Sequence, residues 1–193
     1  MSLKESVYSI LVASASENFN SSLSSMLPSS FYPIHFVSDI STAKRAIAER
    51  SFDFVIINSP LPDDLGVSFT IDLCATRGTI VLLLVRADVH VETHDKVVDH
   101  GVFTLPKPTS KQTIQQALSW MVSARERLRK LEKNTLSIQE KMEEIRLVNR
   151  AKWLLIRELL MDEPQAHRYI EKQAMDRCVT RKEVAEEIIK TYS

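Results

Sequence analysis

Two hydrophobic patterns divide this chain. Between residues 7 and 105, short apolar runs alternate with amphipathic stretches. Runs that are apolar throughout are typical of parallel strands buried on both faces, so the alternation predicts a doubly wound parallel sheet. Five strands fit the flavodoxin-like order. The predicted strands are Tyr8–Ala13, Ile34–Val37, Phe54–Ile57, Ile80–Val85 and Val102–Leu105.

Helical stretches are expected between these strands. One follows Glu17, one starts near Ser41, one follows Asp64 and one runs through Val91–His100. Ser41 opens the segment Ser-Thr-Ala-Lys and is the expected N-cap of the second helix. The pattern assigns residues 1–110 to one α/β domain.

From Ser110 onward the pattern changes to one long helix, because no Gly or Pro occurs between Lys111 and Glu163. Apolar residues recur there at alternating steps of three and four, which is the signature of a coiled coil. We predict a coiled coil over residues 111–148 that holds a homodimer together. Its coiled-coil seam includes Met121, Leu128, Leu131, Thr135, Ile138, Met142, Ile145 and Asn149.

Polar residues at two seam positions, Thr135 and Asn149, weaken a coil but fix its register and partner number. The alternative is a single amphipathic helix packed on the α/β domain. It suits only the first two turns, because a helix of about 40 residues extends beyond a domain this small.

Two short helices with clear start signals follow the long one. Asp162 is the expected N-cap of the first, with Pro164 in its first turn and Gln165 completing a capping box. Thr180 and Glu183 form the capping box of the second. With the end of the long helix they predict an all-α three-helix domain over residues 149–193.

Charge differs between the two halves. The chain carries 25 Lys/Arg and 25 Asp/Glu, so it is not a simple polybasic nucleic-acid binder. Residues 1–110 hold 8 basic against 12 acidic side chains, and residues 111–193 hold 17 against 13. This asymmetry suggests different partners for the two halves.

Other composition features narrow the function. Cys74 and Cys178 fall in different predicted domains, which argues against a disulfide framework and a zinc site. The apolar runs are too short to span a membrane and no signal peptide is evident, so we expect a cytoplasmic protein. No phosphate-binding glycine motif, carboxylate pair or triad is apparent, which predicts no enzyme activity, cofactor or metal.

The segment FDFVIINSPLPDDLG and the segment LPKP at Leu105–Pro108 resemble the ends of strands three and five of a response-regulator receiver domain. The resemblance covers residues 6–110. In that family an acidic pair binds Mg²⁺, an Asp accepts phosphate, and a Thr or Ser and a Lys complete the site. Here these positions are degenerate, being Ser14, Ala15, Asn58, Val85 and Lys107.

Four of these five residues cannot supply the family's chemistry. Ser14 and Ala15 provide no carboxylate for Mg²⁺, Asn58 cannot form an acyl phosphate, and Val85 has no hydroxyl. The resemblance therefore implies a receiver fold that is not phosphorylated and acts by interaction with its own copy, a regulatory protein or a ligand. Lys107 either hydrogen-bonds Asn58 or a strand-end carbonyl, the favoured alternative, or binds another anion.

Residues 145–191 resemble the ANTAR domain of AmiR/NasR-type transcription antitermination regulators. The resemblance rests on Ala151-Lys152, Ala166-His167, Ala174-Met175 and Ala185. It implies a dimer that binds paired hairpins of leader RNA, whose unstacked bases and phosphates suit aromatic and basic side chains. The candidate RNA-binding residues are Arg150, Lys152, His167, Arg168, Lys172, Arg177, Arg181 and Lys182.

One departure from the family keeps alternatives open. Trp153 stands where the family usually has Gly, so its indole either fills core space or blocks a close approach to RNA. RNA-binding antitermination is the leading hypothesis. The main alternative is a protein-interaction adaptor with decayed RNA binding, and a DNA-binding response regulator comes third.

Overall fold

The computed structural model describes residues 7–76 and 78–192 of the 193-residue chain. Contacts between backbone positions divide it into two compact units, residues 1–129 and 130–193. The division falls inside the 49-residue helix α5 (Lys111–Leu159), so both units contain part of this helix. The continuous helix expected from the absence of Gly and Pro is present.

A five-stranded parallel sheet forms the centre of the first unit, as predicted. Its strand order is β2-β1-β3-β4-β5, the flavodoxin-like order. Every residue of β1 and of β3 is buried, which matches their apolar runs. The strands are β1 (Ile10–Ala13), β2 (Ile34–Val37), β3 (Phe54–Asn58), β4 (Ile80–Arg86) and β5 (Phe103–Lys107).

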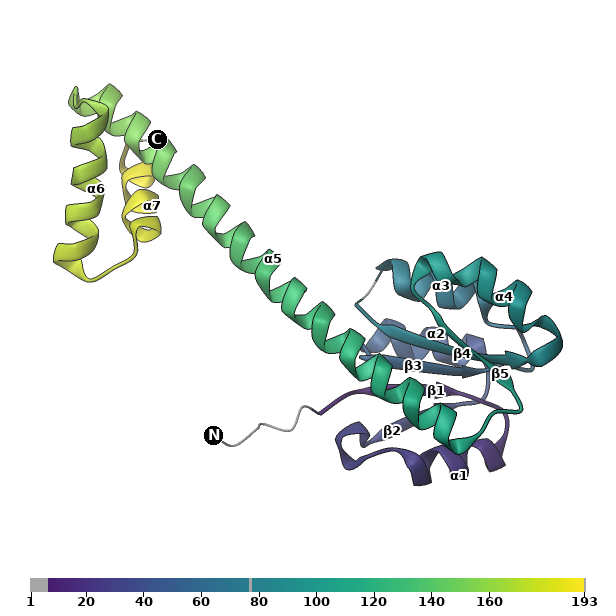
Figure 1. Ribbon diagram of the computed structural model, residues 1–193. Coiled ribbons are helices and arrows are strands. Elements are labelled where there is room, and N and C mark those ends of the chain that lie inside the picture. Colours follow the sequence, from purple (N-terminus) through teal and green to yellow (C-terminus); the bar gives the residue numbers. More distant parts are fainter. Residues whose placement is uncertain (1–6, 77, 193) are drawn as a thin grey trace. The chain divides into compact units, whose positions relative to one another are not determined.

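Helices cover both faces of this sheet (Figure 1). One core lies between the sheet and α2, α3 and α4, and the other lies between the sheet, α1 and the first turns of α5. The sequence thus folds as an α/β layer structure in which β1, β3 and β4 are buried, whereas the edge strands β2 and β5 are partly exposed. The helices are α1 (Glu17–Met26), α2 (Ile40–Glu49), α3 (Val67–Thr76) and α4 (His90–Val97), with short 3₁₀ turns at Ser29–Phe31, Ala87–Val89 and Val98–His100.

The start of α2 differs from the expectation. Its N-cap is Asp39, whose carboxylate accepts a hydrogen bond of 2.7 Å from the backbone N–H of Thr42. The prediction of Ser41 as the cap was wrong, because Ser41 already lies in the helix and donates its hydroxyl to Asp63. Asp63 also accepts from the backbone N–H of Ile40 and Ser41, so two carboxylates satisfy this helix end.

The second unit is a small bundle of the last part of α5 with α6 (Glu163–Arg177) and α7 (Arg181–Tyr192). Both predicted capping boxes are present, at Asp162 with Gln165 and at Thr180 with Glu183. The core of the bundle consists of Ala151, Leu154, Leu155, Ala166, Ile170, Ala174, Val184, Ala185 and Ile188.

A partly buried ion-pair network fastens the start of α5 to the rest of the first unit. Asp53, just before β3, accepts hydrogen bonds from Arg125 Nε and Arg129 Nη2, each at 2.9 Å. It also accepts from the backbone N–H of Ser9 at 3.0 Å. Burial opposes the charge of this carboxylate, but these hydrogen bonds and the charge of Arg129 outweigh burial and hold the pKa of Asp53 below its ordinary value.

Asp53→Asn should lower the free energy of unfolding of the first unit by about 2 kcal/mol at pH 7, because two arginines lose a partly buried partner. The folded pKa is depressed, so the contribution is present above the unfolded value of about 3.9 and is lost as the pH falls through the folded pKa. Urea unfolding over a pH series, followed by circular dichroism, measures both effects.

Asp88→Asn is the matched control, because Asp88 pairs with Arg86 at 2.8 Å on an exposed surface. Removing that pair should cost less than about 0.5 kcal/mol and show little pH dependence. Equal losses for the two variants would contradict the structural role given to Asp53.

Candidate functional site

Three of the five degenerate phosphorylation positions, Ser14, Asn58 and Lys107, form a largely buried hydrogen-bond chain at the carboxyl ends of β1, β3 and β5. Ala15 is exposed and Val85 is buried, and neither belongs to this chain. Lys107 Nζ donates to Asn58 Oδ1 at 2.7 Å, and Asn58 Nδ2 donates to Ser14 Oγ at 3.0 Å. Ser14 Oγ also accepts the backbone N–H of Ser16 at 3.2 Å. The favoured interpretation of Lys107, a hydrogen bond to Asn58, is therefore confirmed.

The ammonium of Lys107 is hydrogen-bonded to a neutral group, the amide of Asn58. Burial lowers the pKa of Lys107 from its ordinary value, and no carboxylate in the described part of the chain pairs with it. The carboxylates of Asp63 and Asp64, in the loop after β3, are bound to backbone N–H groups of Ile40, Ser41 and Gly66. The amide, hydroxyl and ammonium groups present do not fit Mg²⁺, which requires oxygen ligands with carboxylates among them.

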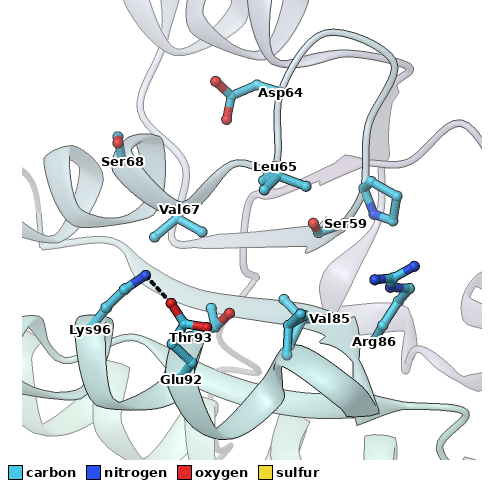
Figure 2. A pocket seen from close by; sticks show the side chains of 12 residues that line it. Ser59, Asp64, Leu65, Val67, Ser68, Val85, Arg86, Glu92, Thr93 and Lys96 are labelled. Carbon is cyan, nitrogen blue, oxygen red and sulfur yellow. Dashed lines mark hydrogen bonds and ion pairs between the residues drawn. The ribbon is translucent and has the colours of Figure 1, made fainter.

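A hollow of about 620 Å³ is lined by Ser59 and Pro60, which directly follow Asn58, and by the end of β4 (Figure 2). Val85 and Val67 form part of an apolar wall, and Ser59 belongs to the loop after β3. Among the charged side chains that line it, Lys96 pairs with Glu92 at 2.6 Å and Arg86 pairs with Asp88, while the Asp64 carboxylate accepts from the backbone N–H of Gly66. Neither Asn58 nor Lys107 lines it, so the hollow has the character of a packing surface rather than an anion site.

The predicted RNA-binding residues of the second unit fall into two groups. Four of them are paired with carboxylates inside the unit: Lys152 with Glu163, Arg177 with Glu187, Arg181 with Glu144, and Lys182 with Glu143 and Glu186. Arg150, Arg168 and Lys172 are exposed and pair with no carboxylate among the described residues. His167 lies 3.3 Å from Glu171.

A basic hollow brings three of these residues together with a fourth that the sequence analysis missed. Lys152, His167 and Arg181 line a hollow of about 410 Å³ from three different helices. Lys141 joins them, since it lies about three helical turns before Lys152 on the same side of α5. This spacing was the available signal. We define the basic hollow by its lining residues Lys141, Glu144, Ile145, Val148, Asn149, Lys152, His167 and Arg181.

Trp153 does not fill core space. Its side chain is 73% exposed, so that one of the two interpretations from sequence is wrong. Arg150 and Arg157 line a small hollow with it, one turn away on either side. The indole is therefore available to a partner.

The coiled-coil seam also divides. Met121 is fully buried in the core of the first unit and Leu128 packs partly against it, so these two positions serve that unit's own fold. The positions that follow remain open to solvent. Leu131, Ile138, Met142 and Ile145 are between 52% and 59% exposed. This stripe is a surface that a second helix could cover.

Comparisons with known proteins fit both units. An ANTAR domain model matches residues 137–189. The transcriptional regulatory protein PdtaR of Mycobacterium tuberculosis is 31% identical over 140 residues, which is 72% of this chain and 68% of PdtaR. The chain belongs to the ANTAR family of transcriptional regulators that includes PdtaR. The predicted order of a receiver domain followed by an ANTAR domain is confirmed.

Solved structures support the fold of the receiver part of this ANTAR regulator. The signal receiver domain of an HD domain-containing protein from Pseudomonas fluorescens Pf-5 is 23% identical, covers 67% of this chain and 96% of its own, and has a TM-score of 0.57. Chemotaxis response regulator CheY4 of Vibrio cholerae is 19% identical, covers 60% and 99%, and has a TM-score of 0.52.

Within the described residues, no helix of this regulator combines the length and apolar character needed to cross a membrane. The same part of the chain contains no group of three or more His, Cys, Asp or Glu side chains that is arranged to hold a metal ion.

Asn58→Ala should lower the free energy of unfolding by about 1 to 3 kcal/mol, because Lys107 and Ser14 each lose a hydrogen-bond partner in a buried position. Asn18→Ala is the matched control, since Asn18 is exposed in the first turn of α1. Urea unfolding of the two variants compares them. Similar losses would mean that the hydrogen-bond chain does not stabilise the pocket.

Proposed function

We propose that this protein is a dimeric RNA-binding antitermination regulator that acts on leader-transcript hairpins in the cytoplasm without phosphorylation. The observation that carries the proposal is the basic surface of the second unit, which belongs to an ANTAR domain. Such a regulator binds hairpins as they form and thereby prevents formation of a terminator.

The charge distribution of the second unit supports RNA as the partner. Arg150, Arg168 and Lys172 are free to meet phosphates, and Arg168 and Lys172 lie one turn apart on α6. The basic hollow adds further cations on a different part of the surface. We propose that exposed cations contribute most of the affinity, because the four paired residues must first give up their carboxylates.

The exposed part of the seam supports the dimer. Four large apolar side chains follow one another on α5 at coiled-coil spacing while each is at least half exposed. Thr135 and Asn149 are exposed among them. We therefore propose that the coil begins at Leu131 and that the preceding heptads anchor each α5 to its own receiver unit.

The hydrogen-bond chain from Lys107 to Ser14 supports independence from phosphate. A receiver holds its phosphoacceptor and metal ligands at these positions. Here the same positions carry an amide and a hydroxyl, hydrogen-bonded in a chain with the ammonium of Lys107. We propose that the receiver unit regulates through its surface, in docking another protein or its own copy.

Binding of the purified protein to an RNA with two adjacent hairpins should be salt-sensitive and should need no phosphate donor. Arg168→Ala/Lys172→Ala should weaken binding at least tenfold and reduce the slope of log K against log salt by up to about 0.7 for each lost phosphate contact. Fluorescence anisotropy at several salt concentrations measures both quantities.

Lys44→Ala/Arg45→Ala is the charge-matched control, because both residues are exposed on α2 of the receiver unit. Its affinity should equal that of the wild type. Absence of RNA binding by folded, dimeric protein would contradict the proposal and favour the adaptor with decayed RNA binding.

Asn149→Leu should tighten self-association or change the number of chains, because it replaces a polar seam residue by an apolar one. Sedimentation velocity over a concentration series measures this, with Lys130→Leu as a control outside the seam. Unchanged sedimentation of Asn149→Leu would remove Asn149 from the interface.

Acetyl phosphate with Mg²⁺ should leave the intact mass of the wild type and of Asn58→Asp unchanged, because both lack the carboxylates that bind the metal. Ser14→Asp/Ala15→Asp/Asn58→Asp restores the acidic set and should gain one phosphoryl group. Phosphorylation of Asn58→Asp alone would contradict this account of the lost chemistry.

A further inference from the structure

The basic hollow is lined by apolar as well as charged side chains. Ile145 and Val148 line it together with Lys141, Lys152 and Arg181. Ile145 is 59% exposed, so its side chain is only partly covered within the chain. A surface of this kind suits an aromatic group, which covers apolar side chains with its face and attracts cations to its π system.

The indole of Trp153 is not packed in the core of its own unit. It is 73% exposed, whereas its neighbour Lys152 is held inside the unit by Glu163 at 2.9 Å and is 16% exposed. Counting heptads from the seam makes Asn149 an a position, so Trp153 is the following e position. Residues at e flank the seam and touch the partner helix in a coiled coil.

The polar seam residues indicate how two copies align. In a parallel dimer Thr135 meets Thr135 and Asn149 meets Asn149, so polar groups face polar groups and every apolar seam residue meets an apolar one. An antiparallel coil centred on the exposed stripe would place both polar residues against apolar ones. The parallel arrangement avoids unsatisfied polar groups in the interface.

A parallel coil brings each g position beside the e position of the following heptad on its partner. Val148 is a g position and Trp153 is the e position that corresponds to it. We infer that the partner's Trp153 covers Ile145 and Val148 and completes the basic hollow, so that each RNA-binding hollow is built from two chains. This inference rests on the coiled-coil dimer of the proposed function.

The preceding heptad supports a shared anion site. There Lys141 at g lies beside the partner's Arg146 at e, a pair of like charges that is unfavourable by itself. An RNA phosphate between them would remove the repulsion. The completed hollow would thus offer cations from both chains beside the partner's indole, and formation of the dimer would be a condition for tight RNA binding.

Cysteine cross-linking in the full chain tests the contact. Both native cysteines, Cys74 and Cys178, are replaced by Ser, and Val148→Cys is co-expressed with Trp153→Cys under two different tags. The mixed disulfide should form at least tenfold faster than with Arg150→Cys in place of Trp153→Cys, because Arg150 lies at b, away from the partner. Equal cross-linking rates in a protein that sediments as a dimer would overturn the inference. That outcome would not contradict the proposed coiled coil.

Fluorescence provides a second test that requires no substitution of the contact residues. The chain has two tryptophans, so Trp120→Phe leaves Trp153 as the sole reporter. In the dimer its emission should be blue-shifted and protected from acrylamide, and dilution to monomer should shift it to the red. If the emission of Trp153 stays red-shifted in the dimer and is quenched only by hairpin RNA, the inference is overturned. The indole would then contact the RNA bases directly. A chain that remains monomeric would overturn both the inference and the proposed coil.

Discussion

The attachment of α5 to the receiver unit is the constraint on which the rest of the molecule depends. Asp53 binds Arg125 and Arg129, and the first turns of the helix bury Ile114 and Met121 against the sheet. One face of the helix is thereby used within the unit. The same heptad pattern continues past residue 130, where Leu131, Ile138, Met142 and Ile145 are at least half exposed. This exposed part of the pattern is the surface on which the proposed coiled coil rests.

The first unit keeps the receiver fold with Ser14, Ala15, Asn58 and Val85 at positions where the receiver family has acidic or hydroxyl side chains. Parallel strands buried on both faces depend on apolar packing, which substitutions at the ends of the strands leave intact. Asn58 accepts from Lys107 and donates to Ser14, so the lysine keeps a partner without a carboxylate. The pocket thus contains a hydrogen-bond network of one ammonium, one amide and one hydroxyl.

The sequence predicted the elements whose signal is local or periodic. The five strands, the long helix and both capping boxes follow from runs, spacing and short motifs. The cap at Asp39 was missed because the serine two residues later is an equally good cap by composition. The pairing of Arg177 with Glu187 and the gathering of Lys141 with Arg181 join residues on different helices. Spacing along α5 could have indicated Lys141 beside Lys152, but it carries no signal for a contact between two different helices.

The central claim is that two unphosphorylated chains bind one leader RNA. Native mass spectrometry of the complex with an RNA of two adjacent hairpins, without a phosphate donor, tests it most directly. We predict two chains per RNA at low ionic strength, and the same stoichiometry after treatment with acetyl phosphate and Mg²⁺. A complex with one chain, or a complex that forms only after that treatment, would contradict the account.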